Sequence, residues 1–267
     1  MSLMTGSATL AWTDRAGRLA TSAAFARLVL LAAFLLFWEF GAAWWGDRAM
    51  VRPLSEVVQA LFNRVLSDPK ILAAIRVTFL ELSLAYGLAI LVGLGIGLTI
   101  GMSRWAEAGA FPLVVMLYGV PQVVLLPLFI LVFGLGPASK IAFGFSHGVF
   151  PIIFNVVAGM RNVNQLYLRS ARSMGATPLE VFRHVTFPHM VPSFFAGLRL
   201  AMTMTLLGIL LAELYVSSAG IGYYTQVFSE TFNPAPLFAL IAVLAGMAIL
   251  LNELVRIAER RFTRWKD

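Results

Sequence analysis

Residues 161–192 read RNVNQLYLRSARSMGATPLEVFRHVTFPHMVP and lie between two long apolar segments. Such a long, charged stretch is costly to place in hydrocarbon, so we expect it to protrude into water. Its four arginines indicate the cytoplasmic side, because cytoplasmic loops of membrane proteins are enriched in Lys and Arg. A structured, charged loop at a membrane surface suggests a protein that binds a soluble partner there.

The composition places the rest of the chain in a bilayer. Of its 267 residues, 60% are hydrophobic and 12% are charged, whereas a soluble domain has about 25% charged residues. The mean hydropathy is +0.84, and several apolar runs are long enough to span hydrocarbon. The absence of cysteine excludes disulfides and thiolate metal sites. The net charge of +7 is explained by arginines beside apolar segments rather than by an aromatic-rich patch for nucleic acid.

We predict an all-α membrane protein with six spans and a cytoplasmic amino terminus. The predicted spans are residues 25–45, 72–102, 111–134, 138–160, 190–215 and 236–257. The cytoplasmic segments are then 1–27, 103–110, 161–189 and 256–267.

The distribution of basic residues supports this topology. The predicted cytoplasmic segments hold 13 of the 20 basic residues: Arg15, Arg18, Arg27, Arg104, Arg161, Arg169, Arg172, Arg183, Arg256, Arg260, Arg261, Arg264 and Lys266. Tryptophans mark both interfaces, with Trp44 and Trp45 at the outer face and Trp105 and Trp265 at the inner face.

Three regions follow from this topology. Residues 1–24 are a cytoplasmic tail, 25–258 form the transmembrane domain, and 259–267 are a cytoplasmic carboxyl-terminal tail. A cleaved signal peptide is the alternative for the amino terminus, because an apolar run follows basic residues. The run is too long for the apolar core of a typical signal peptide and long enough to span.

Three local patterns predict how the spans pack. Apolar residues at helical spacing over 54–66 predict a short helix in the first outer loop, lying flat at the interface or packed on the bundle. Gly93, Gly97 and Gly101 predict close approach of a second helix. The third span also contains Pro112, and further along it Pro121 and Pro127 would break or kink a helix. This broken segment could line the pathway, or it could serve only the packing of helices.

The loop itself predicts two helices. A polar helix over about 163–174 ends at Gly175, since glycine favours the position after a helix. Thr177 suits an N-cap, Pro178 the first helical position and Glu180 the acidic position of a capping box. Pro188 and Pro192 bracket the start of the next span. The alternative is an ordinary connecting loop, although such loops seldom carry two capped helices.

This loop resembles the EAA motif of binding-protein-dependent ABC transporter permeases. The family pattern is Glu-Ala-Ala, three residues, Gly, nine residues, an aliphatic residue, one residue and Leu-Pro. The corresponding residues here are Arg169, Ser170, Ala171, Gly175, Val185, Phe187 and Pro188. The spacing agrees, while Arg169 and Ser170 depart from the family's Glu and Ala.

The resemblance covers about residues 72–258 and points to the nitrate/sulfonate/taurine branch. Its further motifs are Leu126-Pro127-Leu128-Phe129, Phe133-Gly134-Leu135-Gly136 with Ser139-Lys140, Phe150-Pro151-Ile152, Gly197-Leu198-Arg199, Glu213 and Gly220-Ile221-Gly222-Tyr223. The fold that it implies is that of a type I ABC importer permease with a cytoplasmic coupling-helix loop at 161–189.

The resemblance also implies partners. In such importers the loop docks in a groove of an ATP-binding subunit, and closure of two ATPases on ATP rocks the spans between inward-open and outward-open states. The residues implied in coupling are Arg169, Ser170, Ala171, Gly175, Ala176, Thr177, Val185 and Pro188. A second permease copy and a separate substrate-binding protein complete the importer. Arg169 in place of Glu would require a differently charged ATPase surface.

The chain itself has no G-x-x-x-x-G-K-[ST] motif, and the glycine-rich stretch 134–140 has the wrong spacing. We therefore expect a non-catalytic subunit without a cofactor or metal of its own, with ATP and Mg²⁺ bound by the partner ATPase.

Charged and polar residues within the predicted spans are candidates for the translocation pathway, because ionisable groups in hydrocarbon are costly. The candidates are Glu81, Pro121, Pro127, His147, Arg199, Thr203 and Glu213. Arg199, predicted near mid-depth, could contact a negative group of the solute, with Glu81 or Glu213 tuning the cavity. It could instead form a structural ion pair with a carboxylate. Glu213 could contact the binding protein or a gate, and His147 fits a hydrogen-bonded packing role.

The resembling branch imports nitrate, sulfonates, taurine and pyrimidine vitamin precursors. Glu81 occupies a place where a basic residue is expected in the anion importers, which favours an aromatic or heterocyclic solute. An ion-gradient-driven secondary transporter is the alternative function, although no internal repeat is evident. A scaffold that only recruits a partner would not need Arg199, Pro121 or Pro127 at membrane depth.

Overall fold

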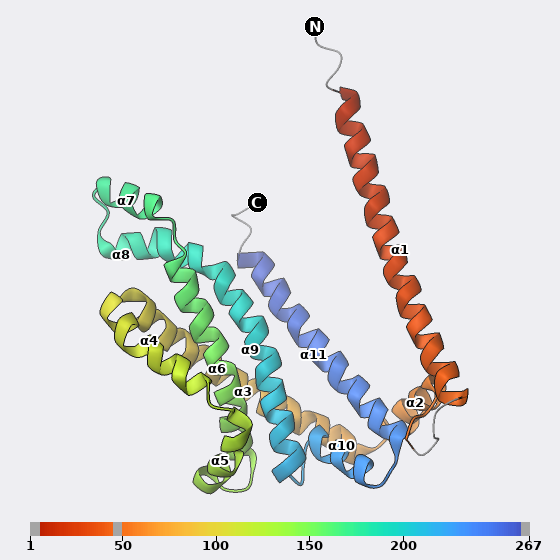
Figure 1. The fold of residues 1–267 in the computed structure, drawn as a ribbon. Helices are drawn as coiled ribbons and strands as arrows, with labels where there is room; N and C mark the ends of the chain where they lie inside the picture. The colour runs from red at the N-terminus through yellow and green to blue at the C-terminus, as the bar shows by residue number, and fades with distance from the viewer. Residues whose placement is uncertain (1–5, 45–49, 263–267) are drawn as a thin grey trace.

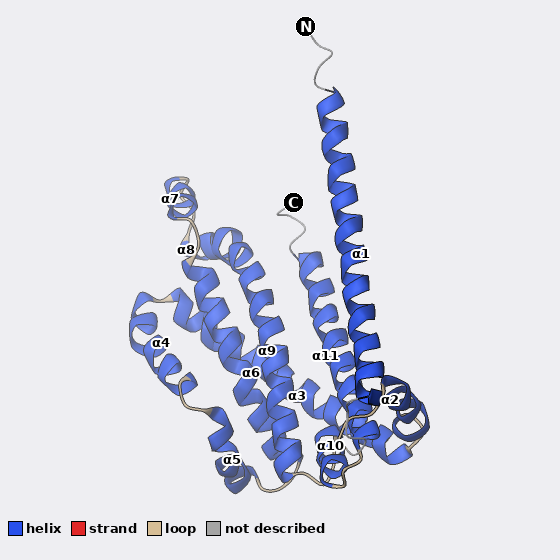
Figure 2. Cartoon of the chain, turned by 45° about the vertical axis from the view of Figure 1, so that its right-hand side comes forward, coloured by secondary structure: helices blue, strands red, loops and turns tan. Residues whose placement is uncertain are grey.

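A computed structural model describes residues 6–44 and 50–262, with side chains described from residue 25 onward, and every element in this part of the chain is helical (Figures 1 and 2). The elements in chain order are α1 (Gly6–Trp44), α2 (Leu54–Ala60), η1 (Leu61–Val65), α3 (Pro69–Met102), α4 (Arg104–Tyr118), η2 (Gln122–Leu125), α5 (Leu126–Phe133), α6 (Pro137–Arg161), α7 (Gln165–Ser173), α8 (Pro178–Val181), η3 (Phe182–Thr186), α9 (Phe187–Val216), α10 (Ile221–Glu230) and α11 (Pro234–Phe262).

Most of the predicted spans are confirmed. Five helical stretches of the described residues are long and apolar enough to cross a membrane, and a bent pair of helices makes a sixth if it counts as one span. Helices α3, α6 and α11 agree with the predicted spans to within about five residues, and the apolar part of α1 covers 25–44. Helix α1 extends back to Gly6, so most of the predicted amino-terminal tail, residues 1–24, is helical.

The third span differs from its prediction. Instead of one helix over 111–134, α4 and the unit formed by η2 and α5 meet at an angle of 81°. The break falls at Pro121, whose lack of an N–H prevents it from continuing the hydrogen-bond ladder of α4. Pro127 breaks nothing, because it lies in the first turn of α5, where its missing N–H has no partner to lose.

The helix that contains the fifth span begins earlier than the predicted residue 190. The helical path runs without interruption from Pro178 through η3 and α9 to Val216. Pro188 lies in the first turn of α9 and Pro192 inside it, and the wide turn η3 precedes both. Since η3 uses hydrogen bonds of longer spacing, the helix accommodates the prolines without ending. The short helix α10 was not predicted.

The core of the fold is α6, which lies between α3 and α9 (Figure 2). On the α3 side, Gly93, Gly97 and Gly101 confirm the predicted close contact. A Cβ placed on Gly93 would lie 2.9 Å from the Cβ of Ile152, and one on Gly97 would lie 2.7 Å from the Cβ of Val156. Only glycine permits this approach of the two backbones.

The outer-loop helix packs on the bundle, which decides between its two predicted placements. Val57 and Ala60 of α2 and Val65 of η1 are buried in one cluster with Ala239 and Leu240 of α11. By contrast, α1 stands away from the bundle in Figure 1, and only 6% of its apolar window is buried. It is joined to α2 by Glu39, whose carboxylate accepts from the N–H and the hydroxyl of Ser55 over 2.9 and 2.8 Å. Trp38 donates to the carbonyl of Arg52, just before α2.

The two ends of the molecule differ. Figure 1 shows α7 and α8 at the end where α1 begins and α11 finishes, while α2, α5 and α10 lie at the opposite end. This is the division that the six-span topology predicts. The predicted interface or loop residues Trp45, Arg48, Arg264, Trp265 and Lys266 lie outside the described residues.

We expect Gly97→Val to destabilise the bundle by about 1–3 kcal/mol, because the added side chain overlaps Val156 of α6. Gly95→Val is the matched control, since a Cβ on Gly95 meets nothing within 4 Å. The measurement is the thermal unfolding midpoint of the detergent-solubilised chain. Equal midpoints for the two variants would contradict the close-contact interpretation.

Candidate functional site

The 161–189 loop begins with a well-terminated helix. The Asn164 side chain accepts a hydrogen bond from the backbone N–H of Leu166 and caps α7. At the other end, the N–H of Ala176 donates to the carbonyl of Ala171 and that of Gly175 to the carbonyl of Arg172. With Gly175 at φ +82°, these are the two bonds of a Schellman motif, which confirms the predicted helix end.

The second half of the loop begins with the predicted capping box. The N–H of Glu180 donates to Thr177 Oγ1 over 3.4 Å, and Glu180 Oε2 accepts from the N–H of Thr177 over 2.7 Å. The Thr177 hydroxyl also donates to Glu180 Oε2 over 2.7 Å. Pro178 occupies the first turn. The loop is therefore a helical hairpin whose turn is fixed by hydrogen bonds.

Burial divides this hairpin into an inner face and a tip. Ala171 of α7 and Val181 of α8 are both only 7% exposed. Met174 and Leu179 at the tip are 80% and 72% exposed. The tip of the hairpin therefore presents two apolar side chains outward.

The remaining motif residues connect the tip to the membrane. Arg169 and Ser170 are exposed on α7, so the substitution of Arg for Glu changes the charge of the surface. Val185 lies in η3 and Pro188 in the first turn of α9, both half-buried. The hairpin is thus continuous with the fifth span.

A buried polar cluster lies at the opposite end of the bundle. Glu81 of α3 forms an ion pair with Lys140 of α6, with 2.6 Å between Oε1 and Nζ, and both side chains are at most 5% exposed. Lys140 also donates to Ser217 Oγ over 3.1 Å. Burial of either charge alone would be costly, so each offsets the desolvation of the other.

Glu213 belongs to the same cluster. Its carboxylate accepts from the Thr78 hydroxyl over 2.7 Å and from the N–H of Gly222 over 2.8 Å. Thr78 in turn accepts from the N–H of Ile221 over 2.8 Å. Gly220, at φ +106°, has no room for a side chain beside this carboxylate. Glu213 thus joins α3, α9 and the start of α10 and is buried, not exposed to a binding protein.

Arg199 of α9 forms an ion pair with Glu259 near the end of α11. Of its two predicted roles, the structure therefore shows the ion pair between helices, and the carboxylate is Glu259, which was not among the predicted candidates. Because Glu259 lies three residues before the last residue of α11, the Arg199 guanidinium lies near the loop end of that helix. The nearby Thr203 is exposed, and its hydroxyl donates to the Arg199 carbonyl over 3.3 Å.

The other predicted pathway residues are dispersed. His147 of α6 packs its ring on Phe143, and its Nδ1 lies 2.9 Å from the Phe143 carbonyl oxygen, the arrangement of a hydrogen-bonded packing residue. Pro121 and Pro127 are exposed on the bent pair. Apart from the neighbours Arg199 and Thr203 on one helix, the candidates that the described residues bring together are Glu81 and Glu213, both beside Lys140.

Sequence reasoning missed Lys140 and Thr78. Lys140 stands at the start of the predicted span 138–160 and was not among the pathway candidates. The signal that could have found it is the pairing of a lone cation at the start of one span with a lone carboxylate inside another, since neither charge is stable alone in hydrocarbon.

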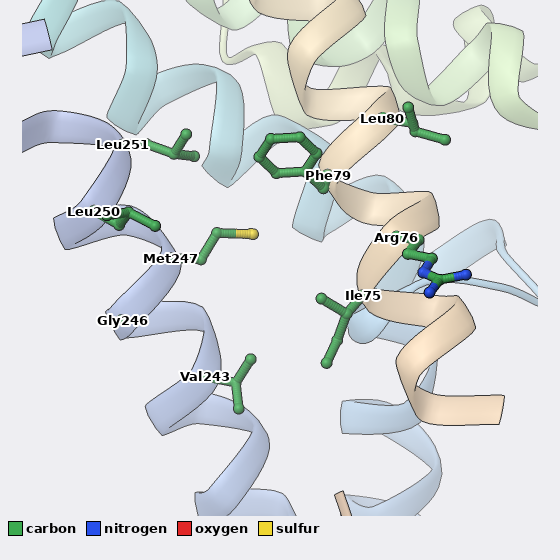
Figure 3. A pocket seen from close by; sticks show the side chains of 9 residues that line it. All are labelled: Ile75, Arg76, Phe79, Leu80, Val243, Gly246, Met247, Leu250 and Leu251. Atoms are coloured by element: carbon green, nitrogen blue, oxygen red, sulfur yellow. The ribbon is translucent and has the colours of Figure 1, made fainter. Parts of the chain in front are cut away.

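An apolar groove of about 550 Å³ lies between α3 and α11 (Figure 3). Ile75 and Phe79 of α3 face Val243 and Met247 of α11 across it, while the Arg76 side chain points away from α11. The groove contains none of the predicted pathway residues.

Comparison with known proteins identifies the family. The family of binding-protein-dependent transport system inner membrane components matches residues 89–264. The chain belongs to this family. The permease is 31% identical over 185 residues to the taurine transport system permease protein TauC of Escherichia coli. The aligned residues cover 69% of this chain and 67% of TauC.

Two further comparisons extend over more of the permease. It is 26% identical over 232 residues to the formylaminopyrimidine transport permease protein ThiX of Halalkalibacterium halodurans, covering 87% of this chain and 92% of ThiX. A chain of the inward-facing MetNI methionine ABC transporter superposes with a TM-score of 0.61 at 16% identity, covering 73% of this chain and 94% of that one. The predicted type I importer permease fold is confirmed.

We expect Lys140→Met to destabilise the permease by about 3–5 kcal/mol, because it leaves the carboxylate of Glu81 buried without its cation. The double variant Lys140→Met/Glu81→Met should recover most of that loss. Arg52→Met, which breaks an exposed pair with Glu56, is the control and should cost at most about 1 kcal/mol. Unfolding of the solubilised permease measures all three, and a double variant no better than Lys140→Met would contradict the pairing.

The capping box predicts an acid-sensitive hairpin. Hydrogen bonds from the Thr177 backbone and hydroxyl lower the pKa of Glu180 below its ordinary value. Because the pKa of Glu180 is lower in the folded hairpin than in the unfolded chain, ionised Glu180 stabilises the hairpin at pH values above its ordinary pKa. This stabilisation is lost as the pH falls through the pKa of the folded state. Amide exchange over 177–182, corrected for intrinsic rates, should accelerate in that window. Glu180→Gln should remove this pH dependence, and equal profiles for the two proteins would contradict the prediction.

Proposed function

We propose that the permease is the transmembrane subunit of an ATP-driven importer. In this proposal two copies form the translocation pathway, each docks one ABC ATPase through its 161–189 loop, and a substrate-binding protein delivers the solute from outside. ATP and Mg²⁺ bind to the ATPase, and this chain contributes no catalytic residue. Family membership supports the ATPase and the binding protein as partners.

The observation that carries the coupling role is the rigid hairpin with its apolar tip. Met174 and Leu179 are held outward between two hydrogen-bonded helix ends. Since the hairpin continues directly into α9, a force on the tip reaches the membrane core without an intervening flexible segment.

The bent pair of α4 and α5 supports the homodimer. Gly119 to Pro121 interrupt the regular hydrogen bonds of a membrane segment, and such backbone is stable only against protein or a water-filled cavity. In the described part of one copy, side chains of this pair are largely exposed, for example Leu117 at 61% and Leu131 at 82%. A second copy facing this pair would cover it and enclose a pathway between the two chains.

The proposed solute is a small organic anion of the sulfonate, taurine or nitrate type, or an aromatic compound of the pyrimidine type. The names of the relatives support both classes. The argument from Glu81 against an anion does not hold, because Lys140 compensates its charge within the core. Selectivity is expected to reside mainly in the binding protein.

The proposed location is the bacterial cytoplasmic membrane, with both termini and the 161–189 loop in the cytoplasm. The basic residues beside the loop end of the helices support this orientation.

Co-purification of the ATPase tests the coupling role. We expect an ABC ATPase, identified by its own phosphate-binding loop peptide, to co-purify with the intact permease in mild detergent. Met174→Asp/Leu179→Asp should abolish this, since it places charges on the apolar tip while leaving the capping bonds intact. Tyr215→Asp/Phe232→Asp is the matched control, since it places two charges on apolar side chains that are 72% and 73% exposed at the opposite end of the bundle, and it should leave co-purification unchanged.

Energy coupling is tested on reconstituted vesicles. Uptake that requires internal ATP and the binding protein supports the importer. Uptake that follows an imposed ion gradient without ATP, in both the intact permease and the tip variant, would replace the proposal with the secondary transporter.

A further inference from the structure

A second cavity lies at the loop end of the bundle, on the membrane side of the hairpin. It has a volume of about 690 Å³ and is enclosed by the end of α3, the start of α4, the end of α6 and the inner face of the 161–189 loop. Its cationic lining residues are Arg104 of α4, Arg161 of α6 and Arg172 of α7. Glu107 is the one carboxylate among its lining residues.

The three arginines do not have the same partners. Arg161 forms an ion pair with Glu107 and lies over the ring of Phe111, with 5.1 Å between Cζ and the ring centroid. Neither Arg104 nor Arg172 forms an ion pair with any residue that the structure describes. With one arginine balanced by Glu107, the cavity therefore keeps an excess of two positive charges for an anion.

The position of the cavity relates it to the lipid surface. α3 ends at Met102 and α6 at Arg161, so the cavity opens at the level where these spanning helices leave the hydrocarbon. Met102 in its lining is 62% exposed, and the neighbouring Trp105 is 90% exposed. An exposed tryptophan at a helix end is typical of the lipid headgroup region.

We propose that this cavity binds the phosphate-bearing headgroup of an anionic phospholipid from the cytoplasmic leaflet. Arg104 and Arg172 contact the phosphate, and the apolar rim at Met102 and Trp105 contacts the upper part of the acyl chains. Basic pockets between spanning helices on this side of a membrane are suited to such headgroups. A free phosphate would use the same two arginines but would gain nothing from the apolar rim.

Bound lipid would join the end of α3 and the start of α4 to α7 of the hairpin, because Arg104 and Arg172 lie on these separate elements. Measuring lipid binding requires neither the transported solute nor the ATPase. The site can therefore be tested on the full-length permease alone.

The test is native mass spectrometry of the full-length permease titrated with phosphatidylglycerol or phosphatidylethanolamine of the same acyl chains. We expect one phosphatidylglycerol to be retained in preference to phosphatidylethanolamine. Arg104→Gln/Arg172→Gln should weaken that binding about 30-fold, from the loss of two cations near the lipid surface. Arg104→Lys/Arg172→Lys should preserve most of it.

The matched control removes the same charge from elsewhere on the loop. Arg169→Gln/Arg183→Gln changes two exposed arginines that do not line the cavity and should leave phosphatidylglycerol binding unchanged. Equal losses in the two double Gln variants would overturn the site in favour of general surface charge. Complete displacement of phosphatidylglycerol by an excess of inorganic phosphate would identify a free-anion site and overturn the lipid assignment.

Discussion

The contact of α6 with its two neighbours is the constraint on which the rest of the fold depends. Lipid gives spanning helices no hydrophobic reason to associate, so close packing through small residues has to hold them. Gly93 and Gly97 bring α3 against α6, and Gly208 brings α9 within 3.0 Å, measured from a Cβ built on Gly208 to the Cα of Gly144. These three helices carry the hairpin at one end and the buried ion pair at the other.

The two polar sites are stabilised by different physics. In the hairpin, the capping groups are exposed to water, and their value lies in fixing a turn through short-range hydrogen bonds. In the buried cluster, Glu81 and Lys140 are removed from water, and their opposite charges prevent a large desolvation penalty. At both ends, polar side chains with protein partners hold neighbouring helices in a defined position. In the hairpin these partners are hydrogen-bonding groups in water, and in the buried cluster they are opposite charges.

The sequence predicted local features well and long-range pairing poorly. The glycine spacing in α3, the end of α7 at Gly175 and the capping box at Thr177 each depend on neighbouring residues, and all three are confirmed. The partners of Arg199 and Glu81 depend on which helices are adjacent and in which register, and periodicity alone does not contain that information. The bend at Pro121 was predictable as a break, whereas its angle and the start of α5 at Leu126 depended on packing.

The helical path from Pro178 to Val216 is uninterrupted, although α8 lies at an angle to α9 in Figure 1. At about 1.5 Å per residue, the 30 residues of α9 are about 45 Å long, so a tilt of about 10° around its middle displaces each end by about 4 Å. One end of α9 continues into the hairpin that faces the cytoplasm in our topology, and the other carries Glu213 with its hydrogen bonds to α3 and α10. Leverage of this kind would turn a small angular movement at the hairpin into the breaking or making of bonds at the far side of the membrane.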